Sequence, residues 1–199
     1  IKIYHKEIID NKKIEKLNSL YKIINDLNHP NIVKSLGFFL GGDFDQPSIL
    51  FEYYSRKLKN VIESIEDIYL ITLIYEIAHA MMIVHSNNLI HRHLNIENIF
   101  VDFENHVKIS DFGNQILVDV SNQIKSSNER PCCLSQELLK NQKYSEKVDV
   151  FAFGMIMKFI LQRGKGSYLK KEEIIEGKPS KIPKAINKVS YSIIKLCLS

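Results

Sequence analysis

One stretch in the middle of the chain restricts its possible folds more than any other. It reads His91-Arg92-His93-Leu94-Asn95-Ile96-Glu97-Asn98, and Asp111-Phe112-Gly113 follows it after residues 99–109, which have the alternation of a small hairpin. Asn98 and Asp111 both offer side-chain oxygens, the ligands that Mg²⁺ prefers. Each motif alone would be near chance, but two motifs on either side of a hairpin make a specific combination.

This order resembles the catalytic loop and the metal-binding turn of the protein kinases. In that family an aspartate accepts the proton of the substrate hydroxyl, and the resemblance places His93 at that position. Asn95 stands where serine/threonine kinases have a lysine, and Arg92 is the arginine of the loop. The resemblance further implies that Asn98 and Asp111 hold Mg²⁺ when ATP is bound.

The resemblance covers essentially the whole chain and implies an α+β, two-lobed protein-kinase-like fold. Residues 1–54 would form a small β-rich N-lobe, truncated before the third strand, and residues 55–199 a larger, mostly helical C-lobe, truncated at its C-terminus. The catalytic loop would span residues 91–98, the Asp-Phe-Gly turn 111–113 and the activation segment 111–137. Because the chain opens on isoleucine and stops inside a helical pattern, both ends are expected to be cut.

Hydrophobic periodicity predicts the helices and strands. Alternation at residues 1–4 predicts a short strand, and apolar residues at every third or fourth position predict a helix over residues 12–28. Two further strands are predicted at residues 32–40 and 48–54. The remaining helical patterns occupy residues 67–87, 145–162, 170–176 and 185–198.

The resemblance also implies a nucleotide site. Lys2 takes the place of the lysine that pairs the α- and β-phosphates of ATP, and Phe51 is the bulky residue at the back of the pocket. The backbones of Glu52 and Tyr54 would contact the adenine edge, and Asp111 would complete the site. An apolar core strand would satisfy residues 50–54 equally well.

One position in the first predicted helix departs from the pattern of active kinases. The resemblance places Leu20 where they have the glutamate that pairs the strand lysine. Glu15 is the nearest upstream carboxylate, but five residues of helix correspond to a rotation of about 500°, so Glu15 points about 140° away from Leu20. We therefore expect Lys2 to lack this partner.

Three further residues are structural by the same resemblance. Asp149 matches the aspartate that anchors the catalytic loop from below, His91 opens that loop, and Glu137 is the retained glutamate of an Ala-Pro-Glu motif. The segment before Glu137 carries Ser121, Ser126 and Ser127, and phosphorylation there would order the loop by pairing with Arg92. A serine-bearing loop without regulation is an equally good interpretation.

Composition limits the class of protein. The net charge of +4 comes from 27 basic and 23 acidic residues in mixed clusters, which argues against a nucleic-acid-binding face. The apolar runs are interrupted, so no membrane segment is expected. Three cysteines without metal-ligand spacing argue against a disulfide framework and a zinc site. We predict an intracellular, cytoplasmic protein.

The residue at position 93 leaves two main hypotheses. Loss of a general base typically costs about 10²–10⁴ in rate, which favours a pseudokinase that binds ATP and Mg²⁺ and acts through contacts with an unknown protein partner. Alternatively, His93 takes the proton itself, since neutral imidazole is a competent base, and the chain is an active serine/threonine kinase. A third class, a structural domain without nucleotide, would require a closed or filled pocket.

Overall fold

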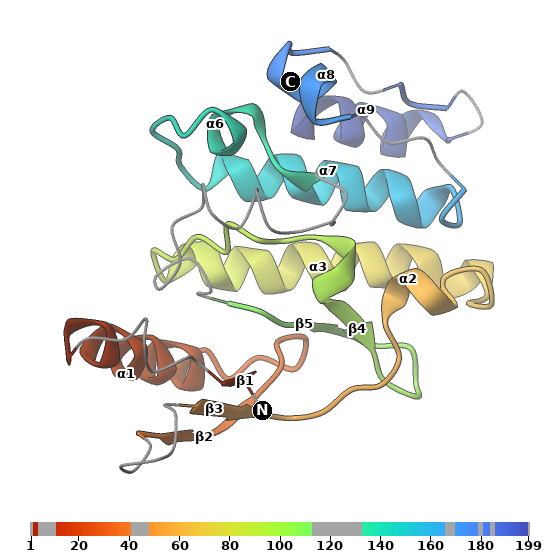
Figure 1. The fold of residues 1–199 in the computed structure, drawn as a ribbon. Coiled ribbons are helices and arrows are strands. Elements are labelled where there is room, and N and C mark those ends of the chain that lie inside the picture. The colour runs from red at the N-terminus through yellow and green to blue at the C-terminus, as the bar shows by residue number, and fades with distance from the viewer. Residues whose placement is uncertain are drawn as a thin grey trace.

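The computed structural model describes most of the chain. The described residues are 2–3, 11–40, 48–112, 133–165, 170–178, 181–183 and 186–198. They form a mixed α+β structure with few strands and more helix. A small sheet and the helix Asn11–Asp26 lie at one end, and the helices Asp67–Ser86 and Lys147–Leu161 are stacked beyond them (Figure 1). Gly113, Ser121, Ser126 and Ser127 lie outside the described residues, so the predictions made for them remain predictions.

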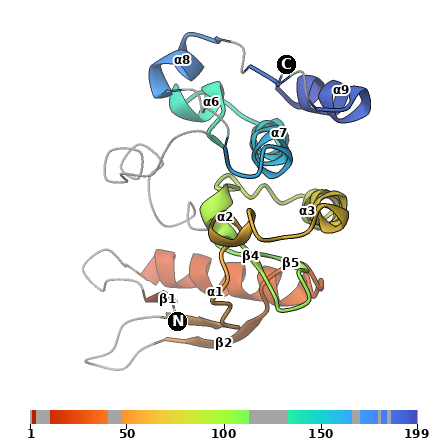
Figure 2. The ribbon, with the colours of Figure 1, turned by 90° about the vertical axis from the view of Figure 1, so that its right-hand side faces the viewer.

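The small sheet consists of three antiparallel strands in the order β1-β3-β2. Their bounds are Lys2–Ile3, Ser48–Phe51 and Ser35–Phe39 in that order. Helix α1, Asn11–Asp26, packs against this sheet, where the ring of Tyr21 stacks on that of Phe38 with 5.7 Å between centroids (Figure 2).

The rest of the chain is mainly helical. A second sheet pairs β4, Ile99–Val101, with β5, Val107–Ile109, and the turn η2, Ile96–Asn98, precedes it. The helices are α2, Leu58–Val61; α3, Asp67–Ser86; α6, Gln136–Leu139; α7, Lys147–Leu161; α8, Lys171–Ile175; and α9, Lys188–Cys197.

Helix α3 is apolar on nearly every side. One face packs against α7 and β5, while Ile68, Ile71, Tyr75 and Met82 are exposed. Helix α3 is long and apolar enough to cross a membrane by length and composition alone, although the apolar runs of the sequence were expected to be too interrupted for this. A central core helix passes the same test, and 44% of its apolar window is buried inside the protein.

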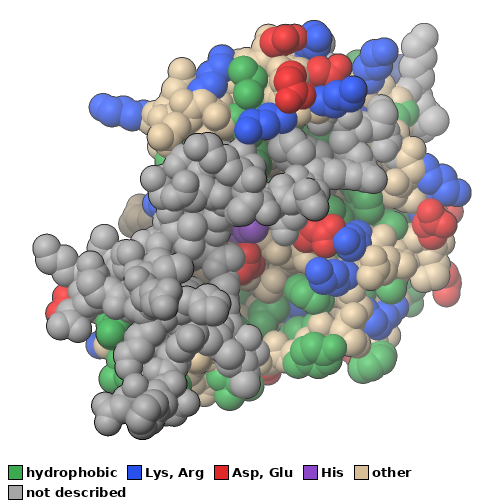
Figure 3. Space-filling model, viewed as in Figure 1, with side chains coloured by type: hydrophobic (Ala, Val, Ile, Leu, Met, Phe, Trp, Pro, Cys, Tyr) green, Lys and Arg blue, Asp and Glu red, His purple; other side chains and the backbone are tan. Residues whose placement is uncertain are grey.

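Helix α7 is the most buried long helix of the described part and lies between α3 and α9 (Figure 1). Gly154 lets α9 approach closely, since a Cβ there would lie 2.7 Å from the Cβ of Cys197. Cys197 is half-buried and Cys133 is buried, and Cys132 lies outside the described residues. On the face shown in Figure 3, basic and acidic side chains are intermixed.

The predicted long helices are confirmed with small shifts at their ends. The strands predicted at residues 32–40 and 48–54 are shorter, because the chain leaves the sheet after Phe39 and after Phe51. The four-residue helices α2 and α6 were not predicted. Each is close to a single turn, which is too short to produce a helical period in the sequence.

Candidate active site

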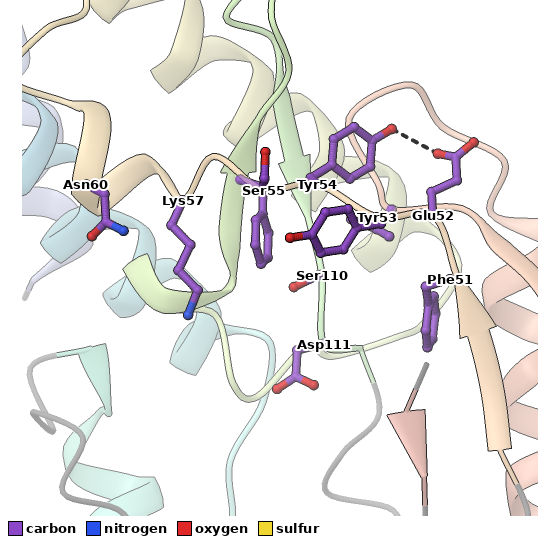
Figure 4. Close-up of a pocket in the computed structure, with 11 residues that line it drawn as sticks. Phe51, Glu52, Tyr53, Tyr54, Ser55, Lys57, Asn60, Ser110 and Asp111 are labelled. Carbon is purple, nitrogen blue, oxygen red and sulfur yellow. Dashed lines mark hydrogen bonds between the residues drawn. The ribbon is translucent and has the colours of Figure 1, made fainter.

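A pocket of about 530 Å³ opens between β3 and the β4–β5 sheet (Figure 4). This volume is within the range of small-molecule sites. It brings together four residues predicted to contact nucleotide, which are Phe51, Glu52, Tyr54 and Asp111. The fifth, Lys2, pairs through its backbone with Ile49 of the neighbouring strand β3, and its side chain is outside the described part.

The segment after β3 carries a hydrogen-bonded pair. Tyr54 Oη donates to Glu52 Oε2 at 2.9 Å, on the side of the segment away from Asp111 (Figure 4). Burial and the Glu52 carboxylate raise the pKa of Tyr54 to about 12, so its hydroxyl keeps its proton. The backbone N–H of Glu52 donates to the carbonyl of Lys34 at 3.0 Å, which fixes the start of this segment.

Asp149 holds the backbone of the loop that contains His91 and Arg92. This carboxylate is 2% exposed; its Oδ2 accepts the N–H of His91 at 2.7 Å and its Oδ1 accepts the N–H of Arg92 at 2.8 Å. His85 Nε2 lies 3.0 Å from the same Oδ2. Arg92 has φ of 64°, in the left-handed region that L-residues avoid, so these bonds stabilise a strained turn.

His91 is a neutral residue of the site interior. Its Nε2 donates to the carbonyl of Ser110 at 3.0 Å, and its Nδ1 accepts the N–H of His93 at 3.3 Å. A carbonyl only accepts and an amide N–H only donates, which fixes the neutral Nε2–H tautomer. Burial lowers the pKa of His91 despite the nearby carboxylates, and its ring packs 4.4 Å from that of Phe112.

His93, Asn98 and Asp111 meet at one point. His93 Nδ1 lies 2.9 Å from Asp111 Oδ2 and 3.2 Å from Asn98 Nδ2, and a proton on Nδ1 would bond the carboxylate, which only accepts. Asn98 Nδ2 donates to the carbonyl of His93 at 2.9 Å, and the carbonyl of Asn98 accepts the N–H of Ser110 at 2.9 Å. The side chains of His93 and Asp111 are 19% and 18% exposed, so the pair is partly shielded from water.

The remaining predicted residues take local roles. Asn95 caps η2, with its Oδ1 accepting the N–H of Glu97 at 2.7 Å. The guanidinium of Arg92 lies 5.2 Å from the ring centroid of Tyr144. Glu137 is half-buried at the start of α6, and Leu20 is 4% exposed within the main hydrophobic cluster, where a charged glutamate would be costly.

A cluster that the sequence did not reveal lies beside the pocket. Lys57 and Lys59 contact the two carboxylate oxygens of Glu97, the first at 3.4 Å. Burial raises the pKa of Glu97, but hydrogen bonds and charge from the two lysines outweigh it and lower the pKa overall. The only sequence signal for this cluster is that Lys57 follows Tyr54 by three residues, and both residues line the same pocket.

The donor chemistry fits Mg²⁺ that arrives with a nucleotide. Asp111 offers a carboxylate and Asn98 an amide oxygen, and Mg²⁺ commonly takes one or two protein oxygens and completes its shell with phosphate and water. The described residues contain no group of three His, Cys, Asp or Glu side chains arranged for a metal ion. Any metal here would therefore depend on the phosphates for most of its ligands.

A mixed α+β fold with this loop and pocket is consistent with the protein kinase class. The chain belongs to the protein tyrosine and serine/threonine kinase family, which it matches over residues 1–199. It is 32% identical over 161 residues to an Aurora kinase of Saccharomyces cerevisiae. The matched region makes up 78% of this chain and 43% of the relative.

Other relatives belong to different branches of the family. The chain is 33% identical over 165 residues to a dual specificity protein kinase of Dictyostelium discoideum, covering 79% of this chain and 12% of the relative. It is 30% identical over 194 residues to the tyrosine-protein kinase Btk of Drosophila melanogaster, covering 89% of this chain and 24% of the relative. The chain thus spans less than half the length of these relatives.

Proposed function

We propose that this chain is a kinase-family domain that binds ATP with Mg²⁺ and transfers phosphate poorly, acting mainly through protein contacts. The observation that carries the proposal is the bond between His93 Nδ1 and Asp111 Oδ2. It joins the residue in the place of the catalytic base to the residue proposed to hold the metal. Proton acceptance at position 93 and metal binding at position 111 would therefore both depend on one contact.

Nucleotide binding is supported by the pocket. Phe51 and Tyr54 offer apolar surface for a base, and Asp111 and Asn98 would hold Mg²⁺. When bound, ATP supplies the phosphoryl group and Mg²⁺ neutralises the charge of its phosphates. The open pocket is unfavourable to the hypothesis of a purely structural domain.

Impaired transfer is supported at two positions. By the resemblance, an imidazole stands at position 93 in place of the family's carboxylate, and a proton on its Nδ1 would occupy an oxygen of Asp111 that the metal would need. The resemblance also places Leu20, which is buried, where the family has a glutamate. Phosphoryl transfer relies on positioning and charge, so losing both groups would slow it beyond the loss of either alone.

The same bond favours a second candidate, an active serine/threonine kinase. An aspartate that holds Nδ1–H of a histidine fixes the tautomer in which Nε2 accepts protons, an arrangement used by general bases. In this hypothesis Nε2 of His93 takes the proton of the substrate hydroxyl and Asp111 orients the ring. The two candidates make opposite predictions for substitutions at position 93.

The test combines binding and transfer in the natural full-length protein. Saturating ATP and Mg²⁺, near 100 times the Kd, should stabilise it by about 2.7 kcal/mol and raise its melting temperature by roughly 5–10 °C. Transfer of labelled γ-phosphate to a generic protein acceptor should be near background and should rise in His93→Asp. His93→Asn, which can still bond Asp111 but cannot take a proton, should stay at background.

The opposite pattern would favour the active kinase. Transfer by the unmodified protein that disappears in both His93→Asn and Asp111→Ala would make His93 a working base and reject the proposal of impaired catalysis. Absence of any thermal shift with ATP would reject nucleotide binding itself.

A further inference from the structure

Lys57 occupies a fixed place at the edge of the pocket. Its backbone forms a bridge with Phe100 of β4, and its carbonyl accepts the N–H of Asn60 at 3.0 Å. Its side chain lines the pocket together with Ser110 and Asp111, and extends toward the part of the pocket where Asp111 lies (Figure 4). The attachment point is therefore rigid, whereas the long side chain can change partner.

Glu97, the partner of Lys57, does not need Lys57 for the neutralisation of its charge. Lys57 Nζ lies 3.4 Å from Glu97 Oε2, longer than the roughly 2.7–2.9 Å of a good charged hydrogen bond. Lys59 contacts the other oxygen, Oε1, more closely. Because both lysines are more than a third exposed and Lys59 alone can neutralise Glu97, releasing Lys57 costs little.

The charges around the pocket favour that release when an anion enters. Glu52 and Asp111 are the acidic residues that line it, and among its described lining residues Lys57 is the only lysine or arginine. A nucleotide polyphosphate that reaches the Asp111 side of this pocket brings several negative charges close to that carboxylate, whereas the Glu52 carboxylate is turned toward Tyr54 on the other side of its segment. A cation that can turn toward these phosphates would offset this repulsion.

We infer that Lys57 is a phosphate-binding residue, whose ammonium group leaves Glu97 and binds the phosphate oxygens of the nucleotide. Glu97 then competes with the nucleotide for Lys57, and Lys59 keeps Glu97 neutralised after the exchange. This inference depends on the proposed nucleotide binding and adds a residue to it. It predicts that Lys57 contributes to the binding of phosphorylated ligands and does not contribute to the binding of the nucleotide's adenine base.

The experiment compares ligands with and without phosphates by titration calorimetry in Mg²⁺. Lys57→Met should raise the Kd for ATP roughly tenfold, the order expected for loss of a charged hydrogen bond, and leave the Kd for adenosine within about twofold. Lys59→Met is the matched control, since Lys59 also holds Glu97 but does not line the pocket. It should change both constants by less than about threefold.

A second variant tests the competition independently. Glu97→Gln removes the competing charge and should tighten ATP binding about threefold, and this gain should vanish when it is combined with Lys57→Met. Equal losses of ATP and adenosine affinity in Lys57→Met, or no loss of either, would overturn the inference while ATP binding by the unmodified protein keeps the proposed function. If the unmodified protein binds neither ligand, the proposed function fails and the inference fails with it.

Discussion

At the scale of single residues, His91 shows how burial fixes a protonation state. Both ring nitrogens have defined partners, the carbonyl of Ser110 and the N–H of His93. A second proton would have to displace the N–H of His93 from Nδ1, and burial already lowers the pKa of His91. The folded protein therefore resists protonation at this site, whereas the unfolded chain does not.

This difference predicts a pH dependence of stability. The folded-state pKa of His91 is below its ordinary value of 6.5, so the unfolded state takes up the proton first. The free energy of unfolding should be undiminished above pH 6.5 and fall as the pH drops toward the lowered pKa, with at most about 1.4 kcal/mol lost per pH unit. His91→Gln keeps a donor and an acceptor but cannot titrate, so urea unfolding between pH 5 and 8 should show a smaller slope for this variant.

His106 provides a control of opposite sign. Its hydrogen bond to Glu76 raises the pKa of His106, so this contribution is fully present below pH 6.5 and is lost as the pH rises through the raised value. The difference in stability between the unmodified protein and His106→Gln should therefore grow as the pH falls, by a small amount because the ring is half exposed. Parallel pH curves for His91→Gln and the unmodified protein would contradict the prediction for His91.

The sequence predicted which residues would lie near one another better than it predicted the contacts between their side chains. The motif order was enough to name His93, Asn98 and Asp111 as neighbours of one loop and turn. The bond from His93 to Asp111 and the contact of Lys57 with Glu97 join residues far apart in the chain. Such pairings depend on the path of the backbone and on rotamers, neither of which has a local signal.

At the scale of elements, long periodic segments could be predicted and short ones could not. Helix α3 was found at residues 67–86 because its apolar positions repeat over several turns. Helix α2 covers four residues after Lys57 and left no such pattern. Its place is set by tertiary contacts instead, since Leu58 is fully buried in the main cluster.

The close contact between α7 and α9 predicts that a single methyl group added at Gly154 lowers the free energy of unfolding. At Gly154 an added Cβ would lie 2.7 Å from the Cβ of Cys197 and 3.0 Å from a methyl of Leu198, so α9 would have to shift. Overpacking of this kind costs about 1–3 kcal/mol, and the better helix propensity of alanine returns about 1 kcal/mol. Gly154→Ala should thus lower the free energy of unfolding by up to about 2 kcal/mol in urea.

Gly37 offers the matched control, because a Cβ there meets nothing within 4 Å. Gly37→Ala should be neutral or slightly stabilising. If Gly154→Ala were more stable than the unmodified protein, α9 would not be packed tightly on α7 at this position.

At the scale of the whole molecule, residues 52–57 continue the chain from β3 to α2, and a turn makes a second link between the small sheet and the helical part. It follows α1, and Val33 N–H donates to the carbonyl of Ile109 while Ile109 N–H donates to the carbonyl of Asn31, both at 2.8 Å. Asn31 Nδ2 adds a buried bond to the carbonyl of Val107 at 3.0 Å. These few hydrogen bonds link the turn after α1 to β5, and Val33 of this turn also lines the pocket.

Removing the side-chain bond should loosen this junction before the rest of the molecule. Asn31 is 7% exposed, so Asn31→Ala leaves the buried carbonyl of Val107 without this donor, and the loss of stability should be about 1–3 kcal/mol. Asn28→Ala, at an exposed position of the same turn, should stay within about 0.5 kcal/mol.

Hydrogen exchange distinguishes a local from a global effect of Asn31→Ala. The amides of Val33 and Ile109, which bond across the junction, should exchange faster by a larger factor than those of α7, because local opening needs less free energy than global unfolding. A uniform acceleration throughout the protein would mean that the sheet and the helices unfold as one unit. In that case Asn31 would stabilise the whole fold, and nucleotide binding at the adjoining pocket would have to stabilise every amide equally.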